Sequence, residues 1–323
     1  MEWRQFGLLI TDRCTAECAF CGLACERQHG DVIDESFAKE VIRQAWEFGV
    51  RDRFAITGGE ALLYPDLCGH LLDYAKELGF TRRTIATNAF WGAWDDSRID
   101  EVLNKLSACT WVSISYDAFH AEYIPQESIW RAIRSMERHK IPGELSIADV
   151  EGEKGAGSFV ASLDDDILNK KMNIYPLLAV GRAENMPDAL FIREQPLEQA
   201  SCFDSDGFAV DPRGRVYPCC SPAIFRTGFA LGDLHEQSLS EILTSSPRLQ
   251  LLHLMGAPRW FYKLALFARD ELGVDVPDMV GNGCEICYRI AKDPAFLQKI
   301  QPAVDKCRQE IFLENLMKRG DAS

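Results

Sequence analysis

Short apolar runs alternate with longer amphipathic segments over the first 180 residues. Six runs have the length and composition of buried strands: residues 6–10, 53–57, 83–87, 111–115, 144–148 and 174–178. Five segments between them have helical spacing of apolar positions: near 34–48, 65–78, 97–106, 126–139 and 159–170. We expect Asp34 and Ser97 to be N-caps, and Gly49 and Gly79 to end their helices. Regular strand–helix alternation predicts a parallel sheet with right-handed crossovers.

This pattern changes near residues 181–200, where one glycine and two prolines interrupt it. Before that point, residues 151–157 (EGEKGAG) are too rich in glycine and charge for a core, which indicates a surface loop after the fifth strand. Beyond it, the chain ends in helical segments, of which 259–272 carries many apolar residues. We therefore expect an α/β fold with two domains, residues 1–185 and 186–323.

Composition narrows the class of protein. With 323 residues, 47% of them hydrophobic, the chain can bury a substantial core. A net charge of -14 without a Lys/Arg-rich block argues against nucleic acid or an anionic membrane as a partner. Residues 1–13 lack a signal-peptide pattern, and no apolar run reaches membrane-spanning length. Twelve cysteines in such a chain indicate metal or redox chemistry in a reducing compartment, so we expect a cytoplasmic protein.

The most informative motif follows the first apolar run. Cys14, Cys18 and Cys21 have the spacing C-x3-C-x2-C. Three thiolates can hold three irons of a four-iron cluster and leave the fourth iron without a protein ligand, which makes that iron a reaction site. Four cysteines would instead close the site, and a zinc knuckle with Cys25 as the fourth ligand is the alternative.

The cysteine spacing, with the aromatic Phe20 before the third cysteine, resembles the radical S-adenosylmethionine (SAM) superfamily. The resemblance implies a partial (β/α)6 TIM-like barrel with its chemistry at the carboxyl ends of the strands. It implies a 4Fe-4S cluster whose open iron binds SAM. It also implies a one-electron reductant, such as flavodoxin or ferredoxin, which splits SAM to methionine and a 5′-deoxyadenosyl radical.

Further motifs fall at predicted strand ends. The family's GGE motif, which binds the amino group of SAM, corresponds here to Gly58, Gly59 and Glu60. Polar side chains that suit a ribose or a methionine carboxylate end later strands, although ordinary polar capping would explain them equally well. The expected SAM contacts are therefore Phe20, Gly58, Gly59, Glu60, Asn88, Ser113, Ser115, Asp117 and Arg182. His120 could position substrate or carry a proton, or be a loop histidine.

Four cysteines of the second region form another candidate metal site: Cys202, Cys219, Cys284 and Cys287. Their spacing resembles the opening of the SPASM auxiliary-cluster domain of peptide-modifying radical SAM enzymes. The full pattern would place another cysteine at position 293, which is Asp293 here. The resemblance therefore implies a shortened, twitch-like domain with one auxiliary 4Fe-4S cluster. The alternatives are a zinc site, or an oxygen ligand from Asp204, Asp206 or Asp211.

Cys220, next to Cys219, is the candidate catalytic residue. A thiol held near the barrel mouth can give a hydrogen atom to a carbon radical. Together with the sequences DAFH, PLLAVGRA and YPCC, this resembles radical SAM peptide epimerases. Those enzymes convert L- to D-residues in ribosomally made (RiPP) precursor peptides.

Other interpretations stay open at this point. Cys220 could be a buried packing residue. The reaction could be a thioether or carbon–carbon crosslink, or the protein a non-catalytic, zinc-containing peptide binder. We expect no separate leader-binding module, because the first strand starts within ten residues of Met1.

Overall fold

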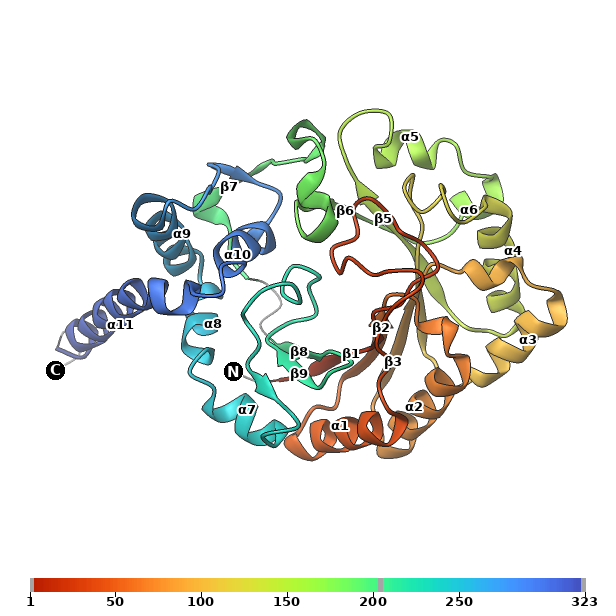
Figure 1. Ribbon diagram of the computed structural model, residues 1–323, viewed down its shortest axis with the longest axis horizontal. Coiled ribbons are helices and arrows are strands. Elements are labelled where there is room, and N and C mark those ends of the chain that lie inside the picture. The colour runs from red at the N-terminus through yellow and green to blue at the C-terminus, as the bar shows by residue number, and fades with distance from the viewer. Residues whose placement is uncertain (1–2, 203–205, 321–323) are drawn as a thin grey trace.

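The computed structural model describes residues 3–202 and 206–320 (Figure 1). The described residues form a nine-stranded sheet in the order β10-β9-β8-β1-β2-β3-β4-β5-β6. Its six N-terminal strands are parallel to their neighbours, as predicted. They are β1 (Gln5–Thr11), β2 (Arg53–Gly58), β3 (Arg82–Thr87), β4 (Trp111–Ser115), β5 (Gly143–Asp149) and β6 (Met172–Pro176). The predicted α/β fold with a TIM-like parallel sheet is therefore confirmed.

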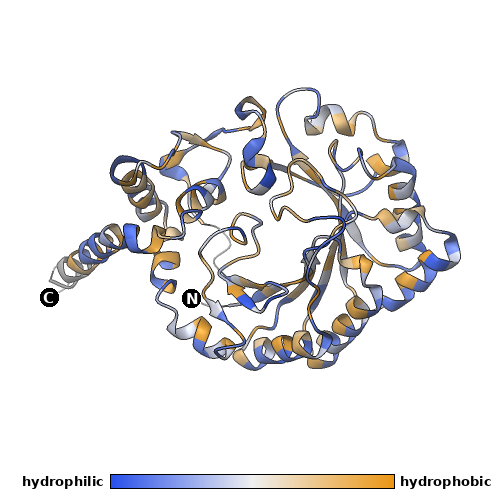
Figure 2. Ribbon diagram, viewed as in Figure 1, coloured by the Kyte–Doolittle hydropathy of each residue, from blue (hydrophilic) through white to orange (hydrophobic). Residues whose placement is uncertain are grey.

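Four helices cover the outer face of the curved sheet in Figure 1: α1 (Glu35–Phe48), α2 (Pro65–Leu78), α3 (Asp96–Lys105) and α4 (Gln126–Arg138). Their ends follow local chemistry. The Asp34 side chain accepts a hydrogen bond from the backbone N–H of Phe37, and Gly49 and Gly79 end their helices in the left-handed conformation. Orange and blue residues alternate along these helices in Figure 2, as expected when one face packs on the sheet.

Three local predictions need correction. The N-cap of α3 is Asp95 and not Ser97, because the Asp95 side chain accepts from the backbone N–H of Arg98. The segment predicted as one helix near 159–170 forms two short helices, α5 (Ala156–Val160) and α6 (Asp165–Leu168). The sixth strand starts and ends two residues earlier than predicted.

The second region contributes strands to the same sheet, which sequence periodicity did not reveal. Strand β8 (Gly207–Val210) pairs in parallel with β1, and β9 (Arg215–Tyr217) and β10 (Gly232–Asp233) extend the sheet beyond it. Aromatic rings stabilise the junction: Phe6 of β1 stacks on Phe208 of β8 at 5.3 Å between ring centroids. The chain after β9 is thereby placed at the mouth of the barrel.

The rest of the second region is mainly helical. It contains α7 (Leu239–Ser245), α8 (Leu249–Met255), α9 (Pro258–Leu272), α10 (Gly283–Ala291) and α11 (Phe296–Gly320). In Figure 1 α7 lies next to α1, and the other helices lie at the left. The helix predicted at 259–272 is confirmed as α9. A two-stranded sheet, β7 (Gln195–Pro196) with β11 (Met279–Val280), completes it. No helix among the described residues combines the length and apolar character needed to cross a bilayer.

Candidate active site

A cavity of about 240 Å³ opens at the carboxyl ends of the parallel strands. It brings together residues that lie far apart in the sequence. Its wall includes the three motif cysteines and the two motif glycines: Cys14, Cys18, Cys21, Gly58 and Gly59. Phe20, Asn88, Ser115 and Cys220 line it as well. Most of the predicted SAM contacts and the predicted hydrogen donor therefore share one enclosure.

The cysteine loop is held by backbone bonds and by one arginine. The N–H of Cys14 donates to the carbonyl of Glu26 at 2.8 Å, closing the loop at its base. The Arg182 guanidinium donates to the carbonyls of Cys18 at 3.1 Å and Cys25 at 2.9 Å. Arg182 is thus a clamp on the loop, and it does not line the cavity that holds the cysteine thiols.

The chemistry of the loop suits metal binding. Burial raises the pKa of the Cys14 thiol to about 11 and that of Cys18 to about 12. The Cys25 thiol donates a hydrogen bond to Cys21, which lowers the pKa of Cys21 and raises that of Cys25. No disulfide ties up any of these sulfurs. Three largely buried thiols around one cavity, able to lose their protons to iron, fit an iron–sulfur cluster.

The two motif glycines let the second strand's loop approach the cysteine loop. A Cβ on Gly58 would lie 2.2 Å from the carbonyl oxygen of Thr11, and one on Gly59 would lie 2.2 Å from that of Arg13. The N–H groups of Gly59 and Glu60 donate to those same two carbonyls at 2.8 and 2.9 Å. Any side chain at these glycines would separate the two loops.

Glu60 is fully buried and has three hydrogen-bond donors around it. Its carboxylate accepts from the N–H of Leu62 at 2.9 Å, the hydroxyl of Thr87 at 2.8 Å and the N–H of Asn88 at 2.7 Å. Desolvation nevertheless raises the pKa of Glu60 to about 7. Glu60 thereby fixes the end of β3, and the Asn88 amide in turn donates to the Thr15 hydroxyl at 3.0 Å.

Polar residues in the second half of β4 and just after it differ in what they contact. The Ser115 side chain faces the cavity, whereas the Ser113 hydroxyl is bonded to that of Ser146 at 2.8 Å and does not line it. The buried Asp117 carboxylate accepts from the N–H groups of Phe119 and His120, both at 3.0 Å. Asp117 therefore shapes this turn.

His120 itself lines the cavity. Its Nδ1 lies 3.0 Å from the Asp117 carboxylate, and its ring meets Phe20 edge-on at 5.3 Å. Asp117 thus holds His120 where it can face a ligand.

Sequence reasoning missed three residues of the cavity wall and one residue behind it: Tyr175, Pro222, Phe225 and Gly7. The first three line the cavity. Tyr175 lies outside any motif, and the sixth strand was predicted two residues late. Gly7 is a strand residue without a motif, yet a Cβ there would lie 2.9 Å from the sulfur of Cys220.

Cys220 is placed by its neighbours on two strands. Its thiol donates to the carbonyl of Phe208 on β8 at 3.4 Å and lies against Gly7 on β1. Since β8 pairs directly with β1, these contacts hold the thiol at the cavity wall. Cys219, its neighbour in sequence, packs into the second hydrophobic core instead.

The four cysteines of the second region meet at another buried site. Burial raises the pKa of the Cys219 thiol, and the neighbouring Cys287, Cys284 and Cys202 raise it further. Cys284 and Cys287 are three residues apart on α10, so they share a face of the helix. A Cβ on Gly283 would lie 2.3 Å from the carbonyl oxygen of Ser201, so glycine allows α10 to approach the chain beside Cys202.

The alternative ligands have other partners or lie elsewhere. Asp204 lies outside the described residues. The Asp206 carboxylate accepts from the Gln5 amide at 2.8 Å, and that of Asp211 pairs with Arg215. Among the described residues, no three Cys, His, Asp or Glu side chains gather closely enough to hold a single metal ion. A four-iron cluster needs wider spacing, because each thiolate binds a different iron.

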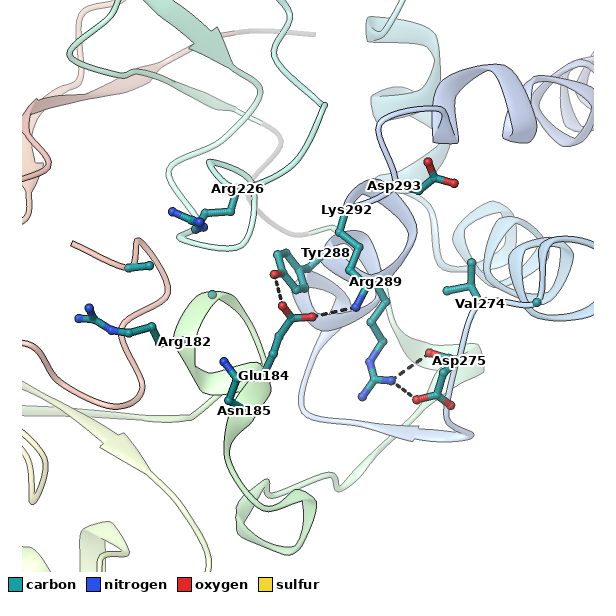
Figure 3. A pocket seen from close by; sticks show the side chains of 13 residues that line it. Arg182, Glu184, Asn185, Arg226, Val274, Asp275, Tyr288, Arg289, Lys292 and Asp293 are labelled. Carbon is teal, nitrogen blue, oxygen red and sulfur yellow. Dashed lines mark hydrogen bonds and ion pairs between the residues drawn. The ribbon is translucent and has the colours of Figure 1, made fainter. Parts of the chain in front are cut away.

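A second cavity, of about 840 Å³, lies beside the first, between the turn Gly181–Asn185 and α10 (Figure 3). Glu184 accepts from the Tyr288 hydroxyl at 2.6 Å and from Lys292 at 2.8 Å, which ties the turn to α10. Arg182 and Arg226 also line this cavity, on its other side in Figure 3. The barrel and the second region are therefore joined next to the cysteine loop by one ion pair and one hydrogen bond.

Comparisons with known proteins agree with this arrangement. Residues 8–144 match the family model of the radical SAM superfamily, and residues 202–261 match that of an iron–sulfur cluster-binding domain, SPASM. The putative peptide biosynthesis protein YydG of Bacillus subtilis strain 168 is 24% identical over 316 residues, which cover 94% of this chain and 97% of YydG. A probable GTP 3′,8-cyclase of Methanococcus maripaludis strain C5 is 25% identical over 142 residues, 42% of this chain and 44% of the cyclase.

Among solved structures, anSMEcpe with bound AdoMet and the peptide Kp18Cys is similar to this chain. The TM-score is 0.59 with 13% sequence identity, over 93% of this chain and 99% of that one. At this identity the similarity establishes a shared fold.

Proposed function

This chain is a radical SAM enzyme with a C-terminal iron–sulfur cluster-binding domain, and on that premise we propose that it modifies a peptide. SAM and iron–sulfur clusters are its cofactors. The proposal of a peptide substrate is supported by the similarity to YydG, a putative peptide biosynthesis protein, over nearly the whole chain. We further propose that the modification is epimerisation of L- to D-residues in a ribosomally made precursor.

The position of Cys220 carries the epimerase proposal. Its thiol lines the same cavity as Cys14, Cys18 and Cys21, the cysteines proposed to hold the cluster. When bound there, the cluster and SAM supply a 5′-deoxyadenosyl radical, which can remove a hydrogen atom from a substrate carbon. Cys220 is a second hydrogen source within the same enclosure. A substrate residue in the cavity can therefore lose its Cα hydrogen on one face and receive another from the thiol.

The hydrogen and electron count of this reaction is balanced when one external reductant takes part. The thiol breaks its S–H bond and the substrate Cα forms a C–H bond, which leaves a thiyl radical on Cys220. One electron and one solvent proton restore the thiol. We propose that a one-electron reductant such as flavodoxin or ferredoxin supplies the electron. We propose that an auxiliary cluster is bound by Cys202, Cys219, Cys284 and Cys287. Because Cys219 is the neighbour of Cys220 in the chain, this cluster is suited to transfer the electron to Cys220.

The test uses anaerobically reconstituted enzyme, SAM, a reductant and the small peptide encoded beside the gene, in deuterated water. Epimerisation adds about one dalton per site, because the returned hydrogen comes from an exchanged thiol. Chiral analysis of the hydrolysed peptide should then identify D-residues. A loss of about two daltons would instead indicate a crosslink or desaturation and overturn the epimerase proposal.

Two variants make the role of Cys220 specific. Cys220→Ala should still form 5′-deoxyadenosine but give no D-residue. Cys109→Ala is the matched control, because the Cys109 thiol also donates to a backbone carbonyl at 3.4 Å but does not line the cavity. Unchanged D-residue formation in Cys220→Ala would remove this thiol from the mechanism.

A further inference from the structure

The edge of the central sheet at β6 is open. β6 is the last strand in the sheet order, and its sequence, MNIYP, carries no charged residue. Ile174 is 50% exposed and Tyr175 is 38% exposed. Edge strands usually carry charges, prolines or other devices against pairing with a further chain. Pro176 at the end of β6 is such a device, whereas the residues before it are uncharged and expose apolar side chains.

The backbone of Ile174 faces away from the sheet. Leu145 N–H donates to the carbonyl of Lys171, and Leu177 N–H donates to that of Asp149, which sets the phase of the β5–β6 ladder. Because bonding residues alternate along a parallel strand, Asn173 and Tyr175 face β5, and Ile174 points its N–H and C=O outward. Within the part of the chain that the structure describes, the Ile174 backbone makes no hydrogen bond on that outer side.

A cavity of about 660 Å³ runs along this edge. Ile174, Tyr175 and Pro176 form one wall, and residues of the second region form the other: Ile192, Glu194, Gln195, Gly281 and Asn282. The space next to the open strand edge is therefore a shallow groove lined by residues of both regions.

The groove adjoins the active-site cavity at one shared residue. Tyr175 lines both this groove and the cavity that holds Cys14 and Cys220. A chain lying along β6 would therefore pass directly beside the site of the proposed hydrogen transfer.

We propose that the substrate peptide binds as an added β-strand on the open edge of β6, with the reacting residue carried past Tyr175 into the active-site cavity. This rests on the proposed peptide substrate. Strand addition recognises backbone N–H and C=O groups, which every peptide has, while the groove walls contact alternate side chains. Strand addition holds a peptide in an extended conformation, so each Cα of the peptide has a defined position along β6.

The experiment measures binding of a labelled substrate peptide by fluorescence anisotropy, with the reconstituted enzyme and SAM. Peptides N-methylated at one backbone position at a time replace single N–H donors. In an added strand, alternate residues face β6, so affinity should fall by about three- to ten-fold at every second position. Equal effects at all positions, or an effect at one position only, would overturn strand addition.

A variant of the enzyme tests the same proposal independently of the peptide analogues. Ile174→Pro removes the outward N–H and leaves the β5 ladder its donors, and proline is tolerated at sheet edges. It should weaken peptide binding by about ten-fold and leave peptide-independent SAM cleavage unchanged. Ile174→Val, which keeps the N–H, is the matched control and should bind as the wild type does. Equal binding by the proline variant would contradict the proposal.

The outcomes separate the two proposals. A peptide that binds with the alternating pattern but is crosslinked would refute epimerisation and keep the strand addition. A peptide that gains D-residues without the pattern would do the reverse. No binding of the peptide at all would refute both the peptide substrate and its mode of binding.

Discussion

Replacing Gly7 with alanine should displace the Cys220 thiol without disturbing SAM chemistry. Gly7 does not have a positive φ, so alanine fits its backbone conformation. Its Cβ would lie 2.9 Å from the Cys220 sulfur. Because non-bonded atoms prefer about 3.5–4.0 Å, the thiol must move by roughly 0.6–1.1 Å. Displacement on this scale can cost about 100-fold in the rate of a positioned reaction.

The assay measures D-residues formed per 5′-deoxyadenosine released. We expect Gly7→Ala to lower this ratio by about 10- to 100-fold, because hydrogen return slows while hydrogen removal does not depend on the thiol. Gly157→Ala is the control, since a Cβ at Gly157 has no neighbour within 4 Å. Thermal unfolding of both variants would show whether either loses stability.

One result would refute the reasoning. An unchanged ratio in Gly7→Ala, with a fold as stable as the wild type, would mean that the thiol position set by β1 does not control hydrogen return. If Cys220→Ala formed no D-residue in the same assay, the thiol would still be the hydrogen donor. Its position in this structure would then not be the one from which it reacts.

Three further predictions concern the site's supports. Burial raises the pKa of Glu60 from 4.5 to about 7, so between these values the native state binds a proton that the unfolded state has lost. The free energy of unfolding should therefore fall by about 2 kcal/mol as the pH rises from 5.5 to 8. Urea unfolding of Glu60→Gln should not show this fall, and a fall as large as that of the wild type would contradict the prediction. Arg182→Met removes two charge-assisted hydrogen bonds to the cysteine loop, so a chelator should take iron from this variant faster than from the wild type. Arg226→Met is the control, because Arg226 lines the same second cavity, and it should release iron more slowly than Arg182→Met. Cys219→Ser should lower iron content from roughly eight to roughly four per chain; unchanged iron would exclude Cys219 as a ligand.

The parallel sheet and the cysteine loop could be predicted because their signals are local. Each strand and helix of the barrel is a short run with its own periodicity, and Asp34, Gly49 and Gly79 act on residues within one turn of themselves. The prediction failed where local signals compete: both Asp95 and Ser97 are good caps, and in the structure Asp95 accepts from the Arg98 N–H while the Ser97 hydroxyl donates to Asp95.

The roles of individual site residues depended on contacts distant in sequence. Arg182 and Glu60 were predicted to bind SAM. The structure gives Arg182 the carbonyls of the cysteine loop, and surrounds Glu60 with donors from β3 and the turn after β2. Both residues are polar groups at strand ends, and the sequence did not reveal these contacts because most of the partners are over twenty residues away. Their contacts with SAM stay predictions.

The sequence by itself determined the α/β class, the cysteine sets and the chemistry they suit, because these follow from residue type and from spacing along a continuous chain. Only the tertiary structure decided which distant elements meet. Pairing of β8 with β1 brings the Cys220 thiol to Gly7 and the cavity wall, and the place of β6 at the sheet edge leaves the Ile174 backbone open beside Tyr175. Strand pairing is set by the packing of whole elements, and no single segment carries that information.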